Sequence, residues 1–525
     1  MSPSGGIGVV LACVVVILAL APLVALTGYG GTFPDTGIFA DPYLARVLRF
    51  SLLQASLSTL LSVLPAILVA RALARRPNLP ARRLVLGLLG VPLVVPSIVV
   101  VLGVVSVFGA DGWLPLGRRL YGLTGILIAH VFFNLPLAAR LLLPSLEQIP
   151  SAQRRLAHQL GFNSWQYWRH IEWPALRGAL PGTALLIFML CLTSFAVVLT
   201  LGGGPRSTTL EVAIYQSLRF DFNPPRAVSL ALMQLGLCAM LAMLSVRLTR
   251  HREVEGDSGG ARHFDRTLGS NTGWARLADG TAIGTALALV AGVLTAIVVD
   301  GANTTMISVL NRPEVLDSLF TSLFIALIAA AMATLCGWLI LTSSTRFAAG
   351  GREWLGNTLE GIATIVYVVP PLVIGTGYFL MLHRLVDLDR LTVPVVIAVN
   401  ALMGLPFVIR SLAAPMRQRA AEYGRLCTSL KICGWQRFVL VDFPLLRRPL
   451  GLAAALAAAL SFGDLGVVAL FASNEQSTLP LLLYRYLSAY RVNEAAVVGL
   501  LLLGSCLMLF VLVERVLGGP RHAGH

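Results

Sequence analysis

The chain has 525 residues, of which 56% are hydrophobic and only 12% are charged. Soluble domains carry about 25% charged residues, so this composition excludes an ordinary soluble protein and an intrinsically disordered one. The formal net charge of +15 is spread over a hydrophobic chain, which argues against a nucleic-acid-binding protein. The sequence therefore predicts an all-α polytopic membrane protein embedded in the lipid bilayer.

Apolar runs long enough to cross a bilayer recur along the whole chain. A transmembrane helix needs about 20 apolar residues, and the first run is long and has no basic residue before it. That pattern favours an uncleaved first span over a signal peptide. Twelve spans are predicted, at 8–26, 51–70, 84–108, 121–143, 179–201, 227–246, 280–299, 318–342, 358–382, 392–414, 449–471 and 495–513.

A polar, glycine-rich stretch divides these spans into two groups of six. The predicted organisation is a first half at 1–247, a linker at 248–278 and a second half at 279–525. Arginines concentrate in alternate loops, such as 71–83, and in the linker. Because positive charge is retained on the cytoplasmic side, these loops, the linker and both termini are expected in the cytoplasm.

The two halves repeat each other over their longest basic loops, 151–177 and 421–447. Trp165-Gln166 aligns with Trp435-Gln436, and Pro174 aligns with Pro444. Since each half has an even number of spans, both enter the membrane with the same orientation, and a shared path is expected between them. A duplicated packing scaffold is the alternative, but it would repeat apolar positions rather than tryptophan, glutamine and arginine. The repeat therefore favours transport.

The repeated loops resemble the EAA loop of ABC importer permeases. That pattern is E-A-A, three residues, Gly, nine residues and I-x-L-P; both loops keep the spacing, with arginine in place of the glutamate. The resemblance implies a type I importer permease fold, with two tandem six-helix halves. It assigns contact with an ATPase to the matching positions, Arg155, Leu156, Ala157, Gly161, Ile171 and Pro174 in the first loop and Arg425, Leu426, Cys427, Lys431, Val441 and Pro444 in the second.

The residues of the first loop give a physical reason for such a contact. Ser151 is expected to cap a short helix at 153–160, and Gly161 can end it in a left-handed conformation. Leu156 and Leu160 then share one face and suit a groove on a partner, although a helix lying on lipid headgroups is an alternative. Lys431 replaces the glycine in the second loop, so that helix is expected to end differently or to run longer.

Two further stretches, 194–216 and 461–480, resemble the thiamine branch of these permeases. The resemblance implies import of thiamine or its phosphates, with a periplasmic binding protein as donor and a dimeric ABC ATPase as motor. It also implies a location in the bacterial inner membrane. A ferric iron permease is an alternative within the family, and an ion-coupled secondary transporter is an alternative from another class.

Motifs for chemistry are not found in the sequence, which has no phosphate-binding G-x-x-x-x-G-K-[ST] loop, catalytic constellation or metal-ligand cluster. The chain is therefore expected not to be an enzyme and to bind no metal or cofactor, with ATP and Mg²⁺ held by a separate ATPase. No nucleic-acid partner is expected.

Polar residues and prolines inside the spans suggest where a translocation path lies. Pro96 and Pro370 are expected to break the third span of each half and to free carbonyl groups toward a cavity. Charged groups at mid-membrane are costly and often functional. The path candidates are Asp464, Ser194, Asn134 and Asn400, and an interhelical hydrogen bond is the alternative role for each.

Overall fold

The computed structural model describes residues 3–29, 42–249, 273–382, 388–432, 434–471 and 477–518. This part of the chain contains helices and no strands. Ten of its helices are long and apolar enough to cross a membrane, which confirms the all-α membrane fold. They are α1 (Pro3–Tyr29), α2 (Pro42–Arg75), α5 (Leu123–Glu147), α8 (Trp173–Leu192), α11 (Pro224–Thr249), α12 (Gly273–Gly301), α14 (Pro313–Ala349), α17 (Leu388–Ser429), α19 (Phe443–Phe462) and α22 (Val492–Gly518).

The third span of each half is broken at its proline. In the first half, α3 (Arg82–Leu88) and a short turn lead to Pro96, and α4 (Ser97–Phe108) follows after a bend of 107°. In the second half, α15 (Glu353–Ile365) leads to Pro370, after which α16 (Pro371–Leu382) begins. Proline has no N–H group for the helix ladder. The expected breaks are therefore confirmed. The predicted number of twelve spans is not confirmed, because the described residues contain ten helices of spanning length, or eleven if the bent pair is counted as one span.

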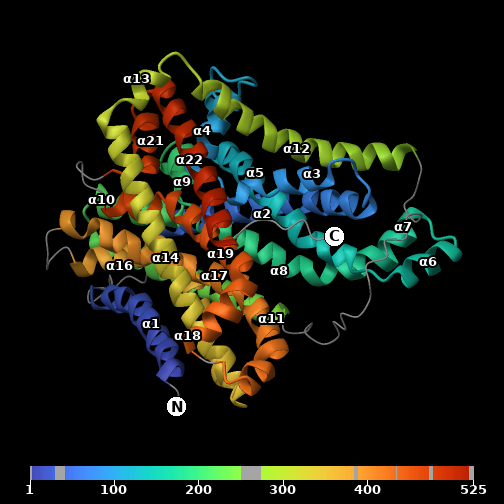
Figure 1. Ribbon diagram of the computed structural model, residues 1–525. Helices are drawn as coiled ribbons and strands as arrows, with labels where there is room; N and C mark the ends of the chain where they lie inside the picture. The colour runs from blue at the N-terminus through green and yellow to red at the C-terminus, as the bar shows by residue number, and fades with distance from the viewer. Residues whose placement is uncertain are drawn as a thin grey trace.

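The first helix of each half packs on the opposite half (Figure 1). Helix α1 contacts α14 and α16, whereas α12 contacts α4 and α2. Two glycines allow the close approach: a Cβ at Gly377 would lie 2.3 Å from the carbonyl oxygen of Pro22, and one at Gly103 would lie 2.6 Å from Val293. Small residues are what lets membrane helices approach closely, so the halves are interlocked rather than merely adjacent.

The repeat is also visible in how two short helices begin. Helices α10 (Leu210–Arg219) and α21 (Leu479–Ser488) occupy matching places in the two halves. The Ser51 hydroxyl accepts the N–H of Leu210 at 3.0 Å, and the Ser322 hydroxyl accepts that of Leu479 at 2.9 Å. In each half, one serine of the second span thus accepts an N–H group at a helix N-terminus that has no partner within the helix.

The predicted boundary between the halves lies largely outside the described residues. Helix α11 ends at Thr249 and α12 begins at Gly273. Residues 250–272, most of the predicted linker, fall between them, as residues 1–2 and 519–525 fall at the ends. The division at 1–247, 248–278 and 279–525 therefore stays a prediction.

Candidate functional site

The two repeated loops present matching exposed surfaces. The first contains α6 (Ser151–Gln159), which projects with α7 (Ser164–Tyr167) from the body of the molecule in Figure 1. In the second loop, the corresponding turns are the end of α17. Both surfaces expose one arginine and two leucines around one buried small residue: Arg155, Leu156 and Leu160 around Ala157, and Arg425, Leu426 and Leu430 around Cys427.

Both of these helices end in the same way. Gly161 has φ of +66° and Lys431 has φ of +53°. In each loop the residue after this position donates its N–H to the carbonyl five residues back, at 3.0 Å in the first and 2.9 Å in the second. This bond is the signature of a Schellman helix end. The expectation that Lys431 makes the second helix end differently is wrong.

The two loops differ instead at their beginnings. Helix α5 ends at Glu147, and Pro150 precedes α6, so the first surface helix is separate from its span. Helix α17 runs without interruption from Leu388 to Ser429, so the second surface helix is part of its span. Its last residue is equivalent to Gln159, the last residue of α6, so the expectation that it runs longer past this end is wrong. Ser151 is the first residue of α6 and not its cap; Pro150 holds that position without a side-chain hydrogen bond.

Each surface helix is connected to the next span by a short segment that we call a joint. The first joint is residues 164–174 and the second is residues 434–444. Both contain five residues of π-helix, Trp168–Glu172 and Phe438–Asp442. Segments of this type are rare and are often found at functional sites. The half-buried Ile171 and Val441 lie in these segments, and Pro174 and Pro444 are the second residues of α8 and α19.

A buried acid ends the π-helix of the first joint. The Glu172 carboxylate accepts from Nε of Arg71 at 2.5 Å and from Nε of Arg75 at 3.1 Å, and both arginines belong to α2. The Arg71 guanidinium also lies 4.8 Å from the ring centre of Trp168. Since charge-assisted hydrogen bonds are stronger than neutral ones, this group of contacts fixes the joint to α2.

The second joint has an acid at the same place with different partners. Asp442 pairs with Arg419 of α17 and lies 3.5 Å from Nε of Arg437 in α18 (Gly434–Arg437). The Arg419 side chain is only 5% exposed. Sequence analysis missed both acids. The available signal was that residues 172 and 442 are equivalent in the repeat and that each is acidic.

A cavity of about 220 Å³ lies between the two halves. The end of α8 contributes Met189, Leu190 and Thr193 from the first half. All other lining residues belong to the second half, from the break before α16, from α17 and from the end of α19: Val368, Val369, Pro370, Pro371, Asn400, Met403, Phe407, Leu460, Ser461 and Asp464. Two of the four path candidates, Asp464 and Asn400, are therefore brought together.

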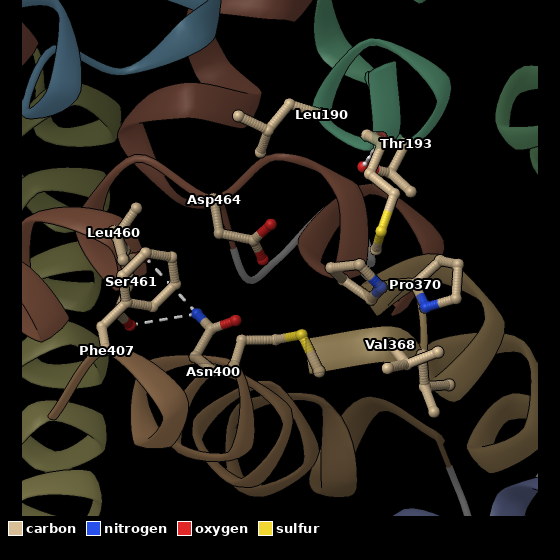
Figure 2. Close-up of a pocket in the computed structure, with 13 residues that line it drawn as sticks. Leu190, Thr193, Val368, Pro370, Asn400, Phe407, Leu460, Ser461 and Asp464 are labelled. Atoms are coloured by element: carbon tan, nitrogen blue, oxygen red, sulfur yellow. Dashed lines mark hydrogen bonds between the residues drawn. The ribbon is translucent and has the colours of Figure 1, made fainter. Parts of the chain in front are cut away.

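The two polar candidates face the cavity in different ways (Figure 2). Asp464 precedes α20 (Gly466–Phe471), and its Oδ1 accepts the N–H of Gly466 at 3.1 Å. Its Oδ2 is buried and has no hydrogen-bond partner. Asn400 donates its amide Nδ2 to the Ser461 hydroxyl at 3.0 Å. The cavity is thus lined by acceptor oxygens of two side chains.

The other two candidates are not part of the cavity lining. Asn134 is buried and donates to the Cys191 sulfur at 3.2 Å, as an interhelical contact would. Ser194 is the repeat equivalent of Asp464 and adjoins Thr193, which does line the cavity. Other buried polar side chains near Asn134 also pair with neighbouring helices, as in the 2.9 Å contact between Ser58 Oγ and His130 Nδ1.

Comparison with known proteins supports the duplication as well as the class. The family described as binding-protein-dependent transport system inner membrane component matches residues 52–252 and 342–518. The chain belongs to this family. Family membership makes it a multi-pass inner-membrane permease component, and it separates the chain from the ion-coupled secondary transporters.

Individual relatives match along almost the whole chain. A thiamine transport system permease protein of Escherichia coli (strain K12) is 44% identical over 522 residues, which is 97% of this chain and 96% of that protein. The protein of the same name from Brucella abortus (strain 2308) is 42% identical, covering 95% and 92%. The one from Haemophilus influenzae is 37% identical, covering 97% and 95%. The resemblance to importer permeases inferred from the repeated loops, and to their thiamine branch inferred from 194–216 and 461–480, is therefore confirmed.

The sequence predicts neither catalytic groups nor metal ligands in this chain. Within the described ranges, no group of three or more His, Cys, Asp or Glu side chains is placed to hold a metal ion. A buried acid outside the cavity, Glu211 of α10, accepts a 3.3 Å hydrogen bond from Gln234 of α11. Its position between two helices of the first half fits a packing contact.

Proposed function

We propose that this chain is the membrane-spanning subunit of an ATP-driven importer for thiamine or its phosphates. The observation that carries the proposal is the 37–44% identity with thiamine permeases over both halves, covering at least 95% of the chain in the three relatives above. The ferric iron alternative lacks such support. The assignment of thiamine as the cargo is wrong if the same importer carries another compound instead.

The substrate assignment is tested by uptake in cells that lack their own thiamine importer. The chain is expressed with its ATPase and binding protein, and uptake of radiolabelled thiamine and of ferric iron is measured in parallel. We expect thiamine uptake to be restored. Restored iron uptake without thiamine uptake would overturn the cargo and leave the transporter class intact.

In the proposed complex, a dimeric ABC ATPase binds the two surface helices and also binds ATP and Mg²⁺. A periplasmic binding protein delivers the cargo to the opposite side. The support for the ATPase contact is the pair of exposed leucines and one arginine repeated on each helix, since an apolar pair four residues apart suits a groove. Movement of the ATPase reaches the spans through contiguous packed contacts, and the joints are the segments that connect them.

The orientation that this complex requires places both termini and the 248–278 linker in the cytoplasm. The supporting observation is that basic residues concentrate in the repeated loops and the linker. A reporter that is active only outside the cytoplasm, fused after Arg515, should be silent. A strong signal from that fusion would reverse the orientation and place the surface helices on the wrong side for an ATPase.

The coupling role is tested by a matched pair of substitutions, Gly161→Arg and Lys431→Gly. A Cβ at Gly161 meets no heavy atom within 4 Å, and Lys431 shows that a long side chain is accommodated in this backbone conformation. Gly161→Arg therefore changes the docking face with little change of fold. We expect strong loss of ATPase co-purification or of transport-coupled ATP hydrolysis, whereas Lys431→Gly is tolerated. Full binding and coupling after Gly161→Arg would exclude the first loop as the coupling element.

A further inference from the structure

We infer that the central cavity is a recognition site for a compact aromatic cation that carries N–H donors. The inference rests on the proposed function and deepens it, because it assigns the cavity to the cationic aromatic part of the cargo. The charge of the site gives the first support. Among the described residues that line the cavity, Asp464 is the one charged side chain, and no Lys, Arg or His accompanies it.

The hydrogen-bonding capacity of the cavity points to the same ligand. Asn400 donates its amide to Ser461, which leaves its Oδ1 as an acceptor toward the cavity (Figure 2). The Thr193 hydroxyl donates to the Met189 carbonyl at 3.0 Å. The Asp464 Oδ2 is a buried acceptor without a donor. A ligand that brings N–H groups and positive charge satisfies these oxygens, whereas a phosphate would place its own negative charge against them.

The size and the apolar walls of the cavity set the shape of the ligand. A cavity of about 150 Å³ holds benzene, so one of 220 Å³ holds a substituted aromatic ring. The Phe407 ring and the sulfurs of Met189 and Met403 are polarisable surfaces for such a ring. The cavity is proposed to hold one cationic ring of the cargo, and the rest of the cargo extends beyond it.

The repeat shows that this chemistry is confined to one half. Ser194, His130 and Cys191 of the first half are equivalent to Asp464, Asn400 and Ser461. The first-half residues bond to neighbouring helices instead, with His130 at 2.9 Å from Ser58 and Cys191 accepting from Asn134. Ser194 precedes α9 (Ala196–Leu201), and that helix begins without a side-chain capping hydrogen bond. The equivalent turn of the first half therefore forms without a capping acid, so capping alone does not explain the Asp464 carboxylate.

The test separates charge from capping by using residues that can also cap a helix. Asp464→Ser and Asp464→Asn keep an acceptor for the Gly466 N–H but remove the negative charge, and Asp464→Glu keeps the charge as a matched control. Uptake of thiamine is measured in vesicles containing the assembled importer. We expect both neutral variants to lose about tenfold or more in transport rate, and Asp464→Glu to lose less than either of them. Asp464→Ser at the wild-type rate would overturn the inference while the thiamine assignment stands.

A second measurement does not depend on thiamine transport. Binding of benzamidine, an aromatic cation with N–H donors, is measured by equilibrium dialysis on the purified chain in lipid nanodiscs, with neutral benzamide as the control probe. We expect the wild type to bind benzamidine in preference to benzamide, and Asp464→Ser to lose that preference. If the wild type moves no thiamine but shows this preference, the proposed cargo fails and the cation site remains. Equal binding of both probes by the wild type would refute the cation site.

Discussion

The first and second joints each end a π-helix with a buried acid, but only the second also buries the arginine that pairs with it. In the first joint the Glu172 side chain is 4% exposed, while its partners Arg71 and Arg75 are 21% and 16% exposed. In the second joint the more buried member is Arg419, at 5%, and Asp442 is 11% exposed. The first joint is held to α2, whereas the second is held to α17, the helix that also contains the second surface helix. Equivalent positions of a duplicated chain are thus anchored to different helices.

The largest expected effect follows from the burial of Arg419. Asp442→Asn leaves the Arg419 guanidinium buried without a counter-charge, which costs about 3–5 kcal/mol. Glu172→Gln leaves arginines that reach water, so we expect a loss of about 1–2 kcal/mol. Thermal unfolding of the purified chain in detergent measures both. Equal losses would show that the two joints bury their charge equivalently.

The second expected effect concerns the continuity of α17. Ala420 is the equivalent of Pro150 and lies inside this helix. Ala420→Pro removes a helix hydrogen bond and introduces a steric clash, which costs about 3 kcal/mol. Pro150→Ala changes a segment that is already interrupted and should cost little. The same unfolding assay compares them, and a tolerated Ala420→Pro would mean that continuity of the second surface helix is unimportant for stability.

The third effect compares the two contacts between a first helix and the opposite half. Gly377→Ala places a methyl group against the backbone of Pro22, whereas Gly103→Ala meets side-chain atoms of Val293 and Ile297. Both overpack their sites, at about 1–3 kcal/mol. We expect Gly377→Ala to be the costlier, since backbone moves less easily than a side chain. A more severe loss at Gly103 would indicate that α12 is the more rigidly held helix.

The smallest effect is at the helix ends. Lys431→Gly should stabilise the chain by up to about 1 kcal/mol, because glycine adopts the left-handed conformation without steric cost. Gly161→Ala is the mirror-image control and should lose a similar amount. Denaturation midpoints in detergent give both values. Destabilisation by Lys431→Gly would show that the lysine side chain makes a contact worth more than the backbone strain.

Composition and local pattern were enough to predict the class of fold, the repeated loops and the breaks at Pro96 and Pro370, because each depends on a short stretch of sequence. The joints were not predictable in the same way. Glu172 pairs with arginines about a hundred positions earlier, and nothing in an apolar span shows which helix it will contact. For the cavity, Asp464 and Asn400 could be selected as polar residues in apolar surroundings, whereas Phe407 and Thr193 resemble ordinary span residues.

Because the first helix of each half packs on the opposite half, α1 cannot reach all of its final contacts until the second half is synthesised. Gly377, against which Pro22 of α1 packs, is synthesised roughly 350 residues after Pro22. At a synthesis rate of about 5–20 residues per second, α1 waits for its neighbour for about 20–70 seconds. During that time its neighbours in the second half are missing, and an apolar helix is stable in lipid because its backbone is internally hydrogen-bonded. The membrane thus acts as a holding compartment until the second half of the chain arrives.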